Sequence, residues 1–289
     1  MDLGDLQKHI DQVMNEQNNR EIPEFEGYSP FEMHHILHFT FEPNNPIDLQ
    51  NLADSDCLKC PMFNLVKYFL DLVKSKGEIK LTAKGFLPTK IVQEIYNQGF
   101  LEEYQFSSGI SKLYKESDSL TVNLTRLLSE LAGLTKKRNG KISLTKTGEK
   151  IASDNQKLFD LIFKTMTQKF SWAYYDHYEN EQIGQFGFGF SLILLSKYGA
   201  EKQLDNFYSD KYIKAFPQFL ESITPTYGTI EEYAGNCYSV RTFERFMHYF
   251  GLVKIEKQGK MLDRKKFIIK TELFDKLIKV RPHNNVYSK

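Results

Sequence analysis

The sequence predicts a mainly α-helical protein with short β-hairpins, in which two related domains follow a helical N-terminal segment. Apolar residues recur at helical spacing along most of the chain. A glycine-lysine hairpin signal occurs twice, at Gly140-Lys141 and at Gly259-Lys260. The length of 289 residues suits two domains, and contents of 41% apolar and 26% charged residues are ordinary for a globular protein.

Residues 1–60 are expected to form an acidic, partly helical N-terminal segment. They hold twelve acidic and three basic side chains. Apolar spacing predicts a helix from Leu6 to Glu16, and Ser29, Pro30 and Glu32 form the start signal of a second helix. The proline-containing stretch 41–56 is typical of a loop or linker.

Residues 61–180 are expected to form the first domain. Helical spacing begins at Met62 and ends at Gly77, and a short strand is expected at residues 79–81. A second helix follows Pro88, a polar insertion covers residues 102–119, and a third helix runs from Leu120 to Ala132. The turn at Arg138-Asn139-Gly140 predicts a hairpin, after which a long helix is expected to end near Tyr178.

Residues 181–289 are expected to repeat this order. Leu127–Lys141 (LLSELAGLTKKRNGK) aligns with Phe246–Lys260 (FMHYFGLVKIEKQGK) after one inserted residue. In both copies a helix ends at a glycine and a hairpin follows. The three helices of the second copy are expected at Phe186–Tyr198, Tyr208–Ile223 and Tyr238–Phe250.

Helix, short strand, helix, helix and hairpin is the order of a winged helix. Residues 62–150 resemble a winged helix-turn-helix domain, and Leu81–Pro88 (LTAKGFLP) resembles a segment that recurs in uncharacterised bacterial proteins with such domains. Glu24–Met33 (EFEGYSPFEM) is similar to a segment of related proteins of unknown function. The resemblance implies a tandem winged-helix protein and carries no assigned activity.

The resemblance suggests binding to duplex DNA. In winged-helix proteins that bind DNA, the third helix enters the major groove and the wing contacts the backbone. Flexible lysines suit phosphate contacts, and Asn or Arg can contact bases. The candidate residues lie on the two third helices and the two hairpins: Asn123, Arg126, Lys136, Lys137, Arg138, Lys141, Arg241, Arg245, Lys254, Lys257, Lys260, Arg264, Lys265 and Lys266.

A second hypothesis is a protein-binding or scaffold module without catalytic activity. The aromatic cluster around Trp172, or the acidic N-terminal segment, would contact a protein partner or a second copy in a homodimer. No nucleophile motif or acid pair selects a catalytic set, so we expect no enzyme.

A metal-assisted role is the weakest hypothesis. Cys57 and Cys60 form half of a zinc site, which His34 and His38 could complete from one helix face. Because no second Cys-x-x-Cys exists, we expect no metal and no cofactor. The glycines at 184–189 do not match a phosphate-binding loop, and the phenylalanines among them are expected to pack in the core or between the domains.

Charge and targeting signals give the remaining expectations. The formal charge is +1, yet the last fifty residues carry thirteen basic and five acidic side chains. The near-neutral total argues against a strong electrostatic attraction for nucleic acid, and the acidic segment could screen the basic one. Without a leader peptide, and with three cysteines and no membrane-length apolar run, the protein is expected in the cytoplasm and not in a membrane.

Overall fold

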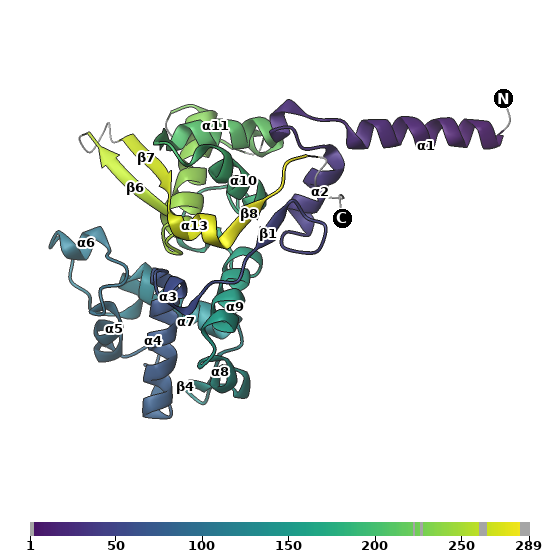
Figure 1. Cartoon of the computed structure of the whole chain (residues 1–289). Helices are drawn as coiled ribbons and strands as arrows, with labels where there is room; N and C mark the ends of the chain where they lie inside the picture. The colour runs from purple at the N-terminus through teal and green to yellow at the C-terminus, as the bar shows by residue number, and fades with distance from the viewer. Residues whose placement is uncertain (1–2, 222, 226–227, 260–264, 284–289) are drawn as a thin grey trace. The chain divides into compact units, whose positions relative to one another are not determined.

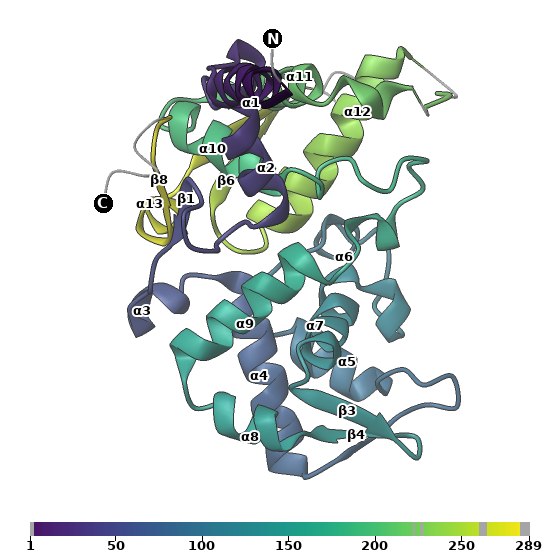
Figure 2. The same ribbon diagram turned by 90° about the vertical axis from the view of Figure 1, so that its right-hand side faces the viewer.

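The computed structural model describes residues 3–221, 223–225, 228–259 and 265–283. The chain divides into two compact units (Figures 1 and 2). Unit 1 comprises Met1–Gln50, His177–Arg245 and Val253–Lys289, and unit 2 comprises Asn51–Asp176 and Phe246–Leu252. Both are mainly helical with small antiparallel sheets, which confirms the fold class at that level. The first fifty residues belong to the same unit as the C-terminal part, whereas the sequence analysis set residues 1–60 apart.

Unit 2 contains the first expected series of elements. In chain order these are α3 (Asp54–Cys57), α4 (Pro61–Lys76), β2 (Ile79–Lys80), α5 (Thr89–Tyr96), α6 (Tyr104–Ser107), η2 (Glu116–Asp118), α7 (Leu120–Leu131), β3 (Thr135–Arg138), β4 (Lys141–Leu144), α8 (Lys146–Ile151), α9 (Asn155–Gln168) and η3 (Trp172–Tyr175). Proline opens α4 at Pro61, and Gly77 with φ of 69° ends it. The helices at 62–76 and 120–131 and the strand at 79–80 therefore confirm the predictions for these segments.

A three-stranded sheet in the order β2-β4-β3 completes this series. Its hairpin turns at Asn139 and Gly140, whose φ angles of 50° and 68° are both left-handed. Two left-handed residues are what a tight type I′ hairpin requires, so the turn signal is confirmed. Figure 2 shows α8 beside β4, at the same end of unit 2.

The prediction of one long helix after the hairpin is wrong. The chain leaves α8 at Ile151 and starts α9 afresh, because the side chain of Asp154 accepts a hydrogen bond from the amide of Lys157 at 3.0 Å. Helix α9 ends at Gln168, and a 3-10 turn replaces the expected continuation to Tyr178. An N-cap residue inside an apolar helical pattern was the signal for this break.

The core of unit 2 lies between α4, α7 and α9. Phe159 and Phe163 of α9 stack at 5.7 Å, and the segment 246–252 adds Phe246 and Phe250 to them. Trp172 packs on Phe246 at 4.7 Å and donates its indole N–H to the carbonyl of Met166 at 2.8 Å. Trp172 of the expected aromatic cluster is therefore interior, whereas Tyr175 and Tyr178 are half-buried and Tyr174 is exposed.

Unit 1 contains the second series and the N-terminal elements. These are α1 (Leu3–Asn19), η1 (Pro23–Phe25), α2 (Pro30–His38), β1 (Ile47–Leu49), α10 (Phe188–Tyr198), β5 (Gln203–Leu204), α11 (Asp205–Ala215), η4 (Pro217–Leu220), α12 (Ile230–Tyr238), the π-helix η5 (Ser239–Met247, its last two residues in unit 2), β6 (Val253–Gln258), β7 (Lys265–Lys270), α13 (Glu272–Leu277) and β8 (Ile278–Val280). Its sheet has the order β5-β7-β6, which matches β2-β4-β3 strand for strand. Both sheets thus add a strand from between the first two helices to a hairpin that follows the third.

Unit 1 differs from the sequence predictions in its second and third helices. The second, α11, ends at Ala215 instead of Ile223, and the 3-10 turn η4 follows it. The third helix begins at Ile230, eight residues before the predicted start, and continues as a π-helix from Ser239. The side chain of Thr229 caps this earlier start through the amide of Glu232 at 3.1 Å. The phenylalanines of the glycine-rich segment pack in the interior as expected, with Phe186 contacting the rings of Phe216 and Phe219 at 5.7 and 5.5 Å.

The N-terminal segment packs on the rest of unit 1. Ser29 and Glu32 form the predicted capping box of α2. Strand β1 pairs antiparallel with β8, and Figure 1 shows these two strands side by side. The carboxylate of Glu26 contacts Lys197 and Lys211 at 2.7 Å each. Part of the acidic charge is therefore neutralised by basic residues of the same unit.

Helix α1 differs from the other long helices because none of its residues is buried. Its apolar side chains, which include Leu6, Ile10 and Val13, are exposed along one stripe. In the portion of the chain that the structure covers, none of the helices has both the length and the apolar content needed to traverse a bilayer.

Candidate nucleic-acid interface

The outer face of the β2-β4-β3 sheet carries a row of cations. Lys80 in β2 is the register partner of Lys141 in β4, and Lys141 is the partner of Arg138 in β3. Directly paired residues share one face of an antiparallel sheet, and their Cβ atoms lie about 4.5–5.5 Å apart. All three side chains are exposed, while Ile79 and Ile142 point to the core. The pairing therefore places three cations side by side across three strands.

One further lysine, Lys136, extends this row, and Lys137 lies on the opposite face of the sheet. Lys136 lies two residues before Arg138, on the same face, and is exposed. Lys137 points to the other face and donates a hydrogen bond to the carbonyl of Gly85 at 3.3 Å, in the loop that follows β2. Lys141 also pairs with the exposed Glu78. The four hairpin residues expected from the sequence are thus all exposed and lie together.

Sequence reasoning missed Lys80. A two-residue strand gives no alternating pattern, so its face could not be read from the chain alone. The local composition did contain a signal, because residues 74–90 and 136–150 together hold eleven Lys or Arg and two carboxylates. The near-neutral total charge concealed this basic region of unit 2.

The third helix of unit 2 does not expose the residues expected of it. Asn123 and Arg126 are 7% and 6% exposed. The carboxylate of Glu116, which is fully buried, accepts hydrogen bonds from Asn123 Nδ2 at 2.5 Å and Arg126 Nε at 2.6 Å. The prediction that these two side chains contact nucleic acid is therefore corrected: a buried carboxylate from the insertion turns a polar helix face into interior.

The N-terminus of α7 is closed in the same way. The side chain of Glu103 accepts hydrogen bonds from the backbone amides of Leu120 and Thr121, both at 3.1 Å, and from the hydroxyls of Ser119 and Thr121. A carboxylate here satisfies the free amides and the positive end of the helix dipole, which a phosphate would otherwise use. Helix α7 acts as core.

The second hairpin differs from the first because its central lysines are neutralised. Lys257 and Lys266 are register partners, and both contact the carboxylate of Glu244, at 3.0 and 2.7 Å. Burial of Glu244 opposes ionisation, but the two ammonium groups outweigh it and lower its pKa. Lys254 and Lys265 are exposed and form no ion pair with any residue the structure describes. Lys260 and Arg264 lie outside the described residues.

The prediction that Arg241 contacts nucleic acid is also corrected. Its side chain is fully buried, and Nη1 donates to the carbonyls of Asn180 and Ile183 at 2.7 and 3.1 Å. The guanidinium also lies over the ring of Tyr178, at 5.8 Å. These contacts hold the segment before α10 in place. Because the guanidinium is buried, it cannot donate hydrogen bonds to a nucleic-acid base. Arg245 is half-buried.

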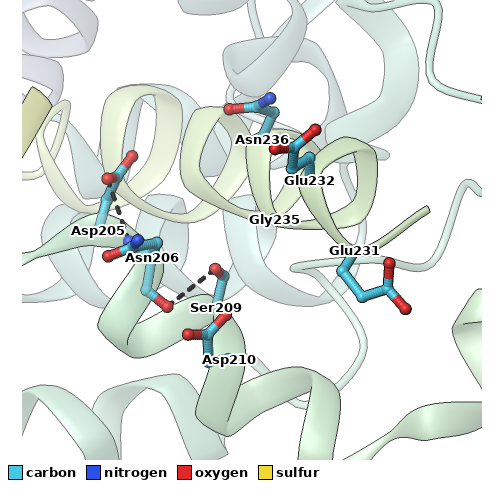
Figure 3. Close-up of a pocket in the computed structure, with 8 residues that line it drawn as sticks. All are labelled: Asp205, Asn206, Ser209, Asp210, Glu231, Glu232, Gly235 and Asn236. Carbon is cyan, nitrogen blue, oxygen red and sulfur yellow. Dashed lines mark hydrogen bonds between the residues drawn. The ribbon is translucent and has the colours of Figure 1, made fainter. Parts of the chain in front are cut away.

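An acidic hollow of about 210 Å³ lies between α11 and α12 of unit 1 (Figure 3). Four carboxylates line it, from Asp205, Asp210, Glu231 and Glu232. Figure 3 shows these side chains on two neighbouring helices, with Glu231 directed away from the other three carboxylates. Such a surface repels phosphate, so the helix face of unit 1 is unsuited to nucleic acid.

The half zinc site is not assembled. Cys57 and Cys60 are fully buried, and burial raises their thiol pKa values to about 11 and about 12. Cys60 Sγ accepts a hydrogen bond from the amide of Phe63 at 3.4 Å and so caps α4. Within the described ranges, no group of three or more His, Cys, Asp or Glu side chains is arranged to hold a metal ion.

One comparison with known proteins gives a match. The family model described as the Y4jL N-terminal domain matches residues 58–157. This range begins at Leu58, just before α4, and ends inside α9, so it lies in unit 2 and includes the whole β2-β4-β3 sheet. No curated protein and no solved structure matches the chain.

Proposed function

We propose that this protein binds nucleic acid through the outer face of the β2-β4-β3 sheet, which we call the basic sheet face (Lys80, Lys136, Arg138 and Lys141). The cross-strand row of Lys80, Lys141 and Arg138 is the single observation that carries this proposal. Glu78 pairs with Lys141, but three cations against one carboxylate leave a net positive charge on this face, which attracts a polyanion.

The chemistry of this face favours the phosphate backbone over the bases. Three of its four cations are lysines, which supply charge on flexible stems, and its three strands contain no Asn or Gln to read a base edge beside Arg138. We therefore propose binding to duplex DNA with little sequence preference and a strong dependence on salt. The shared order of helices and sheet strands supports a winged-helix-like reading of both units, with the wing as the contact and the third helix as core. A cytoplasmic location is consistent with this role.

Unit 1 is assigned no direct contact. The two central lysines of its hairpin, Lys257 and Lys266, are paired with Glu244, and its helix face is acidic. A protein-binding role is the alternative function, and the exposed apolar stripe of α1 favours it. If α1 mediates association, light scattering will give a mass above that of one chain, and deletion of residues 1–19 will restore the monomer.

The proposal is tested by fluorescence anisotropy with a labelled blunt DNA duplex over a range of salt concentrations. The triple variant Lys80→Gln, Arg138→Gln, Lys141→Gln is expected to lose most of its affinity and most of its salt dependence. A matched triple variant removes the same charge from exposed lysines of unit 1, namely Lys214→Gln, Lys254→Gln and Lys265→Gln, and should bind like the wild type. Equal losses in the two triple variants, or no binding by the wild type at low salt, would overturn the proposal.

A further inference from the structure

The insertion that joins α5 to α7 contains a second surface feature of unit 2. Two buried carboxylates anchor it: Glu103 holds the start of α7, and Glu116 binds the amide of Leu87 at 2.5 Å as well as Asn123 and Arg126. Between these anchors the chain lines a hollow of about 650 Å³. This volume lies within the range of about 300–1,000 Å³ typical of small-molecule sites. We call it the insertion hollow (Gln105, Phe106, Gly109, Ile110, Ser111, Lys112, Tyr114 and Asp118).

The lining of the hollow combines polar side chains with three apolar or aromatic ones, Phe106, Ile110 and Tyr114. Ile110 and Tyr114 are 68% and 64% exposed, although each would normally be covered. Phe106 is held by an edge contact with the ring of Tyr96 at 5.3 Å, so one wall is fixed. A fixed aromatic wall beside an exposed tyrosine provides flat apolar surface that costs free energy while it faces water.

Hydrogen bonds connect the rim of this hollow to α5. The carbonyl of Tyr114 accepts from Thr89 Oγ1 at 2.7 Å, and the carbonyl of Leu113 accepts from Gln93 at 3.2 Å. Both donors lie on α5, which the Leu81–Pro88 loop joins to β2, and Lys137 reaches that loop at Gly85. The rim of the hollow is therefore hydrogen-bonded to α5, and the sheet is hydrogen-bonded through Lys137 to the loop that leads into α5.

The cations along this connection suit a phosphate chain. Lys84 and Lys90 are exposed and lie between the sheet and the hollow in sequence, and Lys112 lines the hollow itself. The one carboxylate in the lining, Asp118, accepts hydrogen bonds from the amides of Tyr114 and Lys115. Its negative charge is therefore largely compensated by the chain that surrounds it.

We infer that the insertion hollow takes an unpaired nucleobase of a single strand, stacked on the ring of Tyr114. This inference rests on the proposed function and adds the kind of nucleic acid that the site prefers. Aromatic surface beside lysines is the combination by which proteins bind single strands without reading sequence. The preferred partner is then a duplex that continues as a single strand: paired phosphates lie on the basic sheet face, and the tail reaches the hollow past Lys84, Lys90 and Lys112.

The test compares a blunt DNA duplex with the same duplex carrying an oligothymidine tail, using the full chain. The tailed duplex is expected to bind about tenfold more tightly. Tyr114→Ala should remove this gain and leave the affinity for the blunt duplex unchanged, whereas Tyr114→Phe should keep it. Tyr174→Ala, which removes a tyrosine of unit 2 with similar exposure, serves as the matched control and should keep the gain.

A second readout reports stacking directly. A 2-aminopurine base in the tail should lose fluorescence on binding to the wild type and keep it on binding to Tyr114→Ala. If the blunt duplex binds but the tail adds no affinity and no quenching, the inference about the hollow is wrong and the proposed function stands. If neither DNA binds at low salt, the proposed function itself has failed.

Discussion

The Nε atom of Arg126 lies 2.6 Å from the carboxylate of Glu116, and both side chains are buried in unit 2. Burial favours the neutral arginine, but Glu116 and Glu130 outweigh it and raise the pKa of Arg126. The same carboxylate accepts from the amide of Leu87 and from Asn123. The insertion is therefore fastened to α7 by one charged centre, and the helix that the sequence marks as a DNA reader serves as its anchor.

Replacing Glu116 should strongly destabilise unit 2. Glu116→Ala leaves a buried guanidinium, an amide and a backbone N–H without their acceptor, and we expect the free energy of unfolding to fall by about 3–5 kcal/mol. The matched control is Glu78→Ala, which breaks the exposed pair with Lys141 and should cost at most about 1 kcal/mol. Urea unfolding of the wild type, Glu116→Ala and Glu78→Ala measures both losses of unfolding free energy. Similar small losses would show that the buried pair does not hold the insertion.

Lys80 should contribute one phosphate contact. Lys80→Gln is expected to reduce the slope of log affinity against log salt by about 0.9 for duplex DNA, because one fewer counterion is released. Lys214→Gln, an exposed lysine of unit 1, should leave the slope unchanged. Anisotropy titrations at several salt concentrations give the slopes. An unchanged slope for Lys80→Gln would remove β2 from the interface.

Local sequence signals predicted the correct elements because their physical causes lie within a few residues. The capping box of Ser29 and Glu32 and the left-handed turn at Asn139-Gly140 are satisfied by neighbouring atoms. The N-cap at Asp154 was an equally local signal, and it was missed because the apolar spacing on either side of it continues without a break.

The site residues depended on distant partners and were predicted less well. Asn123 and Arg126 are buried by a carboxylate from the insertion, and Arg241 is buried by carbonyls about sixty residues away. A polar helix face is predicted to be exposed unless a residue distant in the sequence is known to cover it. Here such residues cover Asn123, Arg126 and Arg241. The exposure of Lys136, Lys137, Arg138 and Lys141 could be predicted, because a hairpin tip has few neighbours that could cover it.

Removing Glu244 should make the second hairpin basic. Glu244→Gln removes the negative charge that Lys257 and Lys266 share and so raises the net charge of unit 1 by one, although Lys266 still lies 3.9 Å from Asp205. We expect tighter binding of duplex DNA at low salt and a slope steeper by up to about 1.8, if both lysines reach phosphates. Glu231→Gln, which makes the same charge change in the acidic hollow, controls for net charge. Equal effects of the two variants on affinity would mean that the gain comes from net charge and that the hairpin lysines make no specific contact with DNA.

The cysteines should be unreactive in the folded protein. Cys57, Cys60 and Cys237 are all buried. Because burial raises the thiol pKa of Cys57 to about 11, roughly one molecule in a thousand carries its thiolate at pH 8. A disulfide reagent at pH 8 should therefore label none of the three thiols quickly under native conditions and all three in denaturant. Rapid labelling of the native protein would show that α3 and the start of α4 open readily.

Glu26 should make unit 1 sensitive to acid. Burial opposes its ionisation, but hydrogen bonds from Lys197, Lys211 and Tyr198 prevail and lower its pKa below the ordinary value of 4.5. The unfolded chain then binds a proton more readily than the folded chain. The stabilisation by Glu26 is therefore complete above pH 4.5 and is lost as the pH falls through the lowered pKa. At pH 7 the urea concentration at the unfolding midpoint should be higher for the wild type than for Glu26→Gln. The difference between the two midpoints should shrink as the pH is lowered towards 3. The control is Glu24→Gln, which changes an exposed neighbour; its midpoint should differ from that of the wild type by the same amount at every pH. A difference between wild type and Glu26→Gln that does not change with pH would show that the ion pairs of Glu26 do not stabilise the fold.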